Sequence, residues 1–129
     1  MYYKTCRYRN RIVHWFFCSD EEDFLLFTLD RIGASDRQMK KMREIIAMND
    51  SGFTFSGEKE SVVYISTSSS RREFLNTYVH EIRHLTNDIC NYYDIPLDSE
   101  ESAYIAGELT ECNLSYVHKL ICNENDCID

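Results

Sequence analysis

A five-residue motif near the middle of the chain constrains the fold most strongly. His80, Glu81 and His84 form the pattern H-E-x-x-H. Residues four apart on an α-helix lie on one face, one turn above the other, so the two imidazoles could coordinate a single zinc ion. Glu81 could then reach a water molecule on that metal. Because the motif has this meaning only on a helix, we expect a helix here with one face that packs and another that could do chemistry.

The residues around the motif predict that helix over about residues 71–92. Its packing stripe is expected at Leu75, Val79, Ile82 and Ile89, with Phe74, Tyr78 and Leu85 at the margins. A second stripe carries polar side chains: Thr77, His80, His84 and Asn87. The alternative interpretation is an ordinary polar helix face whose histidines are solvated or satisfied by structural hydrogen bonds.

Length and composition limit the classes of protein to consider. A chain of 129 residues that is 43% apolar is expected to form one domain, spanning 1–129, around one hydrophobic core. The net charge of −8 argues against general binding to nucleic acid, which needs a basic surface. The apolar run Ile12 to Cys18 is too short for a signal peptide or a membrane span, so we expect a cytoplasmic protein that does not bind membranes.

The six cysteines are widely and irregularly spaced and form no C-x-x-C pair. A cytoplasmic chain is expected to hold them mostly as thiols, with Cys90 and Cys112 buried in helices and Cys122 and Cys127 incidental in the tail. The rival interpretation is a disulfide framework in a secreted protein.

Periodicity and turn residues predict a mixed α+β domain in which a small β-sheet packs against helices. Strands are expected at 11–18, 53–55 and 61–67. Before the motif helix, one helix should follow a cap at Ser19 or Asp20 and end at Gly33, and a second should run from a cap at Ser35 or Asp36 to near Asn49. A last long helix is expected over about 100–119, followed by a loose acidic tail, 123–129.

A catalytic zinc needs a third protein ligand besides the two histidines. His14 and His118 are the remaining histidines, but a carboxylate at the start of the last helix is the better candidate. The expected buried stripe of this helix is Ile105, Leu109, Cys112 and Tyr116. Glu101 lies one turn before Ile105 on this stripe, whereas Glu100 lies on a more polar face. A glutamate facing the core is costly unless it is paired or bound to metal, so Glu101 is the predicted ligand. Glu108, two turns further on, could accept a hydrogen bond from a ligating histidine or be an ordinary boundary acid.

These residues together resemble the gluzincin branch of the zincin metallopeptidases: H-E-x-x-H, a short return, then a helix that begins with a glutamate. The segment Glu101-Ser-Ala-Tyr-Ile-Ala-Gly-Glu108-Leu109 is similar to the E-A-N-x-F-A-x-E-L helix of the ImmA/IrrE-like peptidases, small bacterial and phage-associated proteases that cleave transcriptional repressors. The resemblance covers roughly residues 60–118. Only 16 residues separate His84 from Glu101, Ala103 replaces the usual Asn or Asp, and no helix-turn-helix is evident, so the substrate stays open.

The resemblance implies a zincin-like minimal domain that hydrolyses a peptide or protein. Zn²⁺ would be held by three side chains, with Glu81 as the general base. The side chains involved would be His80, His84 and Glu101 for the metal, and Tyr104, Tyr78 or Arg83 as oxyanion donors. The strand before the motif helix, 61–67, would hold substrate as an added strand or be an ordinary central strand.

Two other functions remain open at this point. One is a non-catalytic zincin-like binding module of phage or mobile-element origin. The other is a helical protein without metal, in which H-E-x-x-H is coincidental.

Overall fold

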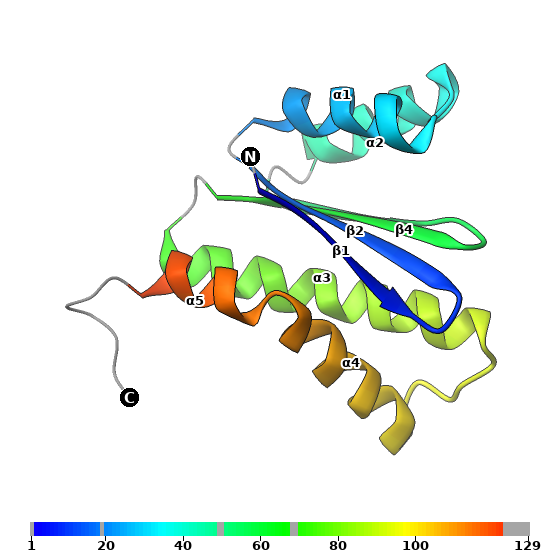
Figure 1. Cartoon of the computed structure of the whole chain (residues 1–129). Helices are drawn as coiled ribbons and strands as arrows, with labels where there is room; N and C mark the ends of the chain where they lie inside the picture. Colours follow the sequence, from blue (N-terminus) through cyan, green and yellow to red (C-terminus); the bar gives the residue numbers. More distant parts are fainter. Residues whose placement is uncertain (1, 19, 49–50, 68–69, 123–129) are drawn as a thin grey trace.

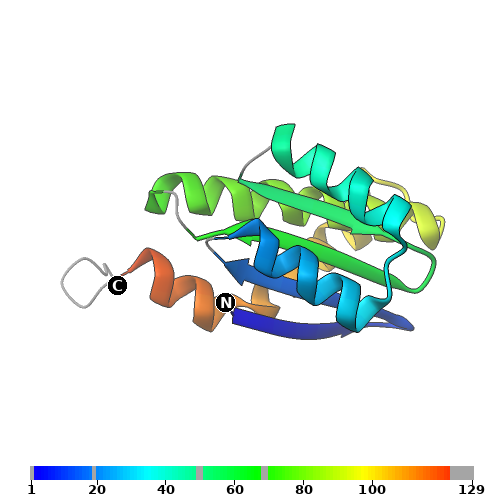
Figure 2. The same ribbon diagram turned by 90° about the horizontal axis from the view of Figure 1, so that it is seen from above.

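In the part of the chain that the computed structural model describes, a four-stranded β-sheet lies between helices. Figures 1 and 2 show these helices as one layer on each face of the sheet. The structure describes residues 2–18, 20–48, 51–67 and 70–122. One face of the sheet carries α1 (Glu21–Ile32) and α2 (Asp36–Met48), and the other carries α3 (Arg71–Tyr92), α4 (Glu100–Cys112) and α5 (Leu114–Ile121). This arrangement confirms the predicted α+β class.

The sheet has the strand order β1-β2-β4-β3, built from β1 (Tyr2–Tyr8), β2 (Arg11–Cys18), β4 (Glu60–Ser66) and β3 (Gly52–Ser56). The two middle strands, β2 and β4, run parallel, and each outer pair is antiparallel. Of the two options for residues 61–67, the structure therefore shows the central strand. The edge strands are β3 and β1, and the sequence analysis did not predict β1.

The middle strands are buried almost throughout because helices cover both of their faces, and most of their residues are apolar. Along β2, Val13, Trp15 and Phe17 pack toward α3, whereas Phe16 and Cys18 pack toward α1 and α2. The sheet therefore separates two hydrophobic clusters, and α3 lies against the larger one.

Helix α3 begins and ends where the sequence predicts, and Ser70 accepts a hydrogen bond from the Glu73 amide as its N-cap. Its packing stripe is rotated from the expected one. The side chains expected at the margins, Phe74, Tyr78 and Leu85, are buried, whereas Leu75 and Val79 are exposed. The large aromatic side chains of β2 explain this rotation, since Trp15 and Phe17 both contact the Tyr78 ring.

The predicted last helix is two helices, because α4 ends at Cys112 and α5 begins at Leu114. Asn113, between them, has φ −109° and ψ 9°, outside the helical region. Asparagine has a low helix propensity, although here its side chain makes no capping hydrogen bond. The break moves the buried position of the last segment to Val117, leaving Tyr116 half-buried against Tyr2.

Two cysteines differ from the prediction of reduced thiols. Cys6 of β1 and Cys112 of α4 form a disulfide, with Cα atoms 6.5 Å apart. Cys90 is a buried free thiol as expected, and Cys18 and Cys122 are also free. Cys127 and the tail lie outside the described residues. None of the helices in the described ranges is long and apolar enough to cross a membrane.

Candidate functional site

The two motif histidines face each other on α3. The Nε2 atoms of His80 and His84 lie 3.0 Å apart, with the rings edge to face. Two imidazole nitrogens bound to one tetrahedral zinc at the usual bond length lie about 3.4 Å apart. The pair therefore fits two neighbouring positions around such an ion with a small change in either side chain.

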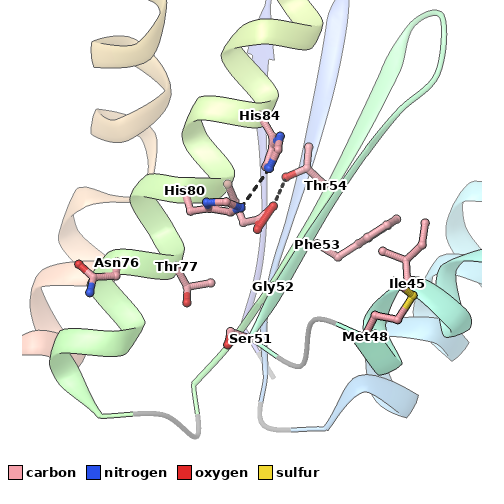
Figure 3. A pocket seen from close by; sticks show the side chains of 11 residues that line it. Ile45, Met48, Ser51, Gly52, Phe53, Thr54, Asn76, Thr77, His80 and His84 are labelled. Carbon is pink, nitrogen blue, oxygen red and sulfur yellow. Dashed lines mark hydrogen bonds between the residues drawn. The ribbon is translucent and has the colours of Figure 1, made fainter.

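Glu81 lies beside this pair but points into the protein. It is only 4% exposed, and its Oε1 accepts a hydrogen bond of 2.8 Å from the Thr54 hydroxyl of β3 (Figure 3). Burial raises the pKa of Glu81 above its ordinary value, an effect that the Thr54 hydrogen bond and the two histidines partly oppose. A carboxyl group with a raised pKa, next to two histidines spaced as zinc ligands would be, has the properties of a general base.

A glycine lets β3 approach α3 this closely. A Cβ atom on Gly52 would lie 2.7 Å from the Thr77 Cγ2 atom and 3.1 Å from Glu81 Cγ. Neither separation is tolerated without movement of a strand or a side chain. The absence of a side chain at Gly52 therefore sets the spacing between the edge strand and the motif helix.

A second polar link holds the same strand to α3 one turn beyond His84. The Ser56 hydroxyl donates a hydrogen bond of 2.7 Å to Asp88, and it lies 2.9 Å from the Ser61 hydroxyl. Ser61 in turn accepts from Arg11, a buried guanidinium that also bonds backbone carbonyls of the β3–β4 turn. Links at Thr54 and Ser56 thus fix the register of β3 along the motif helix.

An open cavity of about 510 Å³ lies over the histidine pair. Figure 3 shows its lining from three elements: the motif helix, the edge strand β3 with the residue before it, and the end of α2. The lining residues are Asn76, Thr77, His80, Glu81 and His84 from α3, Ser51, Gly52, Phe53 and Thr54, and Ile45 and Met48 from α2. The cavity therefore has a polar wall with the histidines and an apolar wall at α2.

The predicted third ligand is elsewhere in the structure. Glu101 accepts a hydrogen bond of 3.0 Å from Arg9, in the turn after β1. The charges of Glu101 and Glu108 both act on Tyr8 and contribute to raising its pKa, although burial is the main cause. Both acids are thus near the β1 edge, whereas the histidines lie near β3. Across the described ranges, no three His, Cys, Asp or Glu side chains form a group that could hold a metal.

The other sequence candidates are also outside the cavity. Tyr104 is 72% exposed on α4, and Arg83 is exposed in a groove between α3 and α4. Tyr78 is a core residue whose hydroxyl donates to the Thr110 carbonyl, and burial raises its pKa to about 12. His14 is buried between Tyr3 and Glu60 on the far face of the sheet. His118 lies on α5, away from the cavity lining.

Sequence analysis missed the contribution of β3. Thr54 and Gly52 belong to a short strand 27 or more residues before Glu81, and neither matches a motif. The only signal was the turn sequence around Gly52, which predicted a strand start but no contact with α3. No family model, curated protein or solved structure matches this chain. The local geometry of the site therefore carries the functional argument.

Proposed function

We propose that the protein is a zinc-dependent peptidase whose active site is the cavity over His80 and His84. The observation that supports this most directly is the arrangement of three side chains. Two imidazole nitrogens face each other 3.0 Å apart, and the adjacent buried carboxyl group of Glu81 is oriented by Thr54. Hydrolysis by metal-activated water requires this combination of a metal-binding pair and a neighbouring base.

Strand β3 is the proposed docking site for an extended substrate. It pairs with β4 on one side only. The pairs Ser51–Ser66 and Gly57–Glu60 are hydrogen-bonded, and such pairs alternate along an antiparallel ladder. The backbone N–H and C=O groups of Gly52, Thr54 and Ser56 therefore point away from β4. A peptide added at this edge would pair with Thr54 next to the general base.

Each group of the site then has a chemical role. A zinc ion, when bound, supplies Lewis-acid polarisation of the scissile carbonyl and lowers the pKa of water. His80 and His84 would hold such an ion, for which neutral imidazoles are needed. Glu81 accepts the proton of the attacking water and returns it to the leaving amine. Thr54 keeps the Glu81 carboxyl group in place through its hydroxyl and binds substrate through its backbone.

Glu101, the third zinc ligand that the sequence predicts, is bonded to Arg9 and lies outside the site in this structure. To reach the metal, its carboxylate would have to leave Arg9 and the β1 edge. An exposed ion pair of this kind contributes about 1 kcal/mol or less, so the pair itself is a small obstacle. The position of α4 is the larger obstacle, because the Cys6–Cys112 disulfide joins this helix to β1.

Zinc binding is tested by measuring bound metal by atomic absorption after dialysis against limiting zinc. We expect one zinc per chain in the wild type and loss of it in His80→Ala and His84→Ala. His118→Ala, which removes a histidine outside the cavity, is the matched control and should retain the metal. Equal zinc content in all four proteins would exclude the histidine pair as the metal site.

Catalysis is tested by incubating the zinc-loaded protein with a pool of blocked synthetic peptides and detecting new termini by mass spectrometry. Glu81→Gln keeps the shape of the side chain but removes its basicity. This variant should bind zinc and lose about 10²–10⁴-fold in cleavage rate, the usual contribution of general acid–base catalysis. Undiminished cleavage by Glu81→Gln would show that Glu81 is not the base.

One observation favours a second function, a non-catalytic binding module on the same framework. Glu101 is engaged by Arg9, and the described residues supply no complete set of three metal-binding side chains. A protein of this kind would bind a peptide on β3 without cutting it. Peptide binding by the wild type without any cleavage, at full zinc occupancy, would distinguish this function from the peptidase.

A further inference from the structure

The cavity extends beyond the histidines to an apolar wall formed by Ile45 and Met48 of α2 together with Phe53 of β3, here called the α2 wall. In Figure 3 these three side chains lie on one side of the edge strand, and His80, His84 and Thr54 lie on the other. One continuous cavity therefore spans both faces of the sheet at its open edge.

Within the α2 wall, Phe53 is buried in the cluster shared with α1 and α2 and Ile45 packs partly against that cluster, but Met48 takes no part in this packing. The buried stripe of α2 is made by Met39, Met42 and Ile46. Ile45 is half-buried and Met48 is 81% exposed, so Met48 and the uncovered part of Ile45 face the cavity and solvent. Methionine is a flexible side chain that adapts its shape to different apolar partners. These two positions thus have the character of a binding surface for apolar groups.

The side chains of β3 alternate between the two walls. Thr54 and Ser56 point to α3, where they bond Glu81 and Asp88. Phe53 and Phe55 point the other way, into the cluster shared with α1 and α2. A strand added at this edge must follow the same alternation, because paired residues of neighbouring strands share a face. The peptide residue opposite Thr54 would face the histidines, and its two neighbours would face the α2 side.

We infer that the α2 wall is a specificity surface, and that the substrate is an extended peptide with bulky apolar side chains at two positions separated by one residue. This inference rests on the proposed role of β3 as the strand that pairs with substrate. The residue between the two apolar positions faces the histidine pair. Peptides with charged side chains at the two positions would have to desolvate them against Ile45 and Met48, which is unfavourable.

The test measures peptide binding by fluorescence polarisation, using zinc-saturated Glu81→Gln so that bound peptide is not cut. The probes are four blocked, fluorescein-labelled octapeptides of Thr and Ser that differ only in which positions carry Leu or Lys. One carries two Leu separated by one residue, the second carries the same two Leu adjacent, the third carries two Lys separated by one residue, and the fourth carries none. Partial burial of the Leu side chains should make the first peptide bind about five-fold or more tightly than the others.

The specificity surface is then changed by adding Met48→Glu to the Glu81→Gln protein. The preference should reverse, so that the peptide with spaced Lys binds more tightly than the one with spaced Leu. Leu26→Glu, which places the same charge at a 62% exposed apolar position on α1 outside this cavity, should keep the original preference. Thermal melting of both variants checks that each is folded.

The outcomes separate this inference from the proposed function. Equal binding of spaced and adjacent Leu, or an unchanged preference in Met48→Glu, would overturn the specificity surface even if the wild type cuts peptides. A preference for spaced Leu that Met48→Glu reverses, with no cleavage by the wild type, would support the surface and contradict the peptidase.

Discussion

The two edges of the sheet differ in how strongly other elements are attached to them. At the β1 edge, Cys6 is bonded to Cys112 of α4, Lys4 donates to the Cys112 carbonyl, and Tyr2 stacks on Tyr116 of α5. The turn that follows β1 adds the ion pair of Arg9 with Glu101. The last two helices are thus fastened to this edge by covalent, polar and aromatic contacts.

The β3 edge has contacts to α3 through Thr54 and Ser56, but no other strand among the described residues pairs with its outer backbone groups. Proteins usually cover or shorten an open edge, because it can pair with other chains. Here the open edge borders the histidine cavity. The contrast suggests that one edge serves stability and the other serves binding, and the mutations below test this division.

The largest stability effect is expected from removing the disulfide at the β1 edge. It joins residues separated by 106 positions, and closing so long a loop restricts the unfolded chain strongly. The double variant Cys6→Ser with Cys112→Ser should lose about 2–4 kcal/mol of unfolding free energy in a urea titration. Wild-type protein in excess dithiothreitol should match that loss of stability, and the double variant, measured without dithiothreitol because this dithiol binds zinc, should retain the zinc affinity of the oxidised protein. A large loss of zinc affinity would show that the two edges are coupled.

At the β3 edge the most sensitive position is Gly52. Gly52→Ala places a methyl group 2.7 Å from Thr77 Cγ2, so the strand or the helix must shift. Overpacking of this kind costs about 1–3 kcal/mol. The same change at Gly107, whose added Cβ would meet nothing within 4 Å in α4, should instead stabilise the protein by about 0.5–1 kcal/mol. Chemical denaturation of both variants measures the difference, and equal effects would argue against close contact at Gly52.

The contrast between the edges also explains what the sequence could predict. The motif helix was correct at both ends because its caps and periodicity are local properties of residues 70–92. The contact of Thr54 with Glu81 is not local, since it depends on β3 pairing with β4 and lying over α3. Strand β1 was missed because each of its residues is exposed or only half-buried, so its sequence has no strongly apolar face.

The prediction of Glu101 as third ligand shows the limit of inferring a side chain's surroundings from helix periodicity. Positions four residues apart differ by about 40° around the helix axis, so a stripe drifts with each turn. Ile105 and Leu109 are buried as predicted. Ser102, which was not predicted to be buried, is buried as well. Glu101, one turn before Ile105, is rotated away from the side of the helix on which Ser102 is buried. Its side chain therefore lies at the β1 edge, next to Arg9. Periodicity placed Glu101 near the core, but it could not determine which neighbouring element the side chain meets.

The buried carboxyl group of Glu81 at the β3 edge is expected to lower the stability of the folded protein, and the pH dependence of stability tests this. Its pKa is raised by burial, so the folded state disfavours the ionised form more than the unfolded state does. At pH values below the unfolded pKa both states are protonated and there is no penalty. The penalty grows as the pH rises through the folded pKa and is complete above it. In metal-free protein, Glu81→Gln should therefore raise the melting temperature at pH 8 more than at pH 4, as measured by calorimetry in EDTA.

The control for this pH dependence is Glu100→Gln, which neutralises an exposed glutamate outside the cavity. Its melting temperature should follow that of the wild type at both pH values. An equal gain from Glu81→Gln at pH 4 and pH 8 would show that the Glu81 carboxyl group is not penalised by its burial.

The smallest effect is expected from Glu101→Ala, and it separates the structure from the sequence prediction. In the structure this carboxylate belongs to the β1 edge, where an exposed ion pair with Arg9 contributes less than about 1 kcal/mol. We therefore expect a small loss of stability and unchanged zinc affinity. Glu100→Ala, the same change at the preceding position of the same helix turn, is the control for the lost charge at the start of α4. If Glu101→Ala alone weakened zinc binding ten-fold or more, the carboxylate would be a metal ligand after all. In that case α4 would have to move toward the histidines when the metal binds, and the β1 edge would be part of the site.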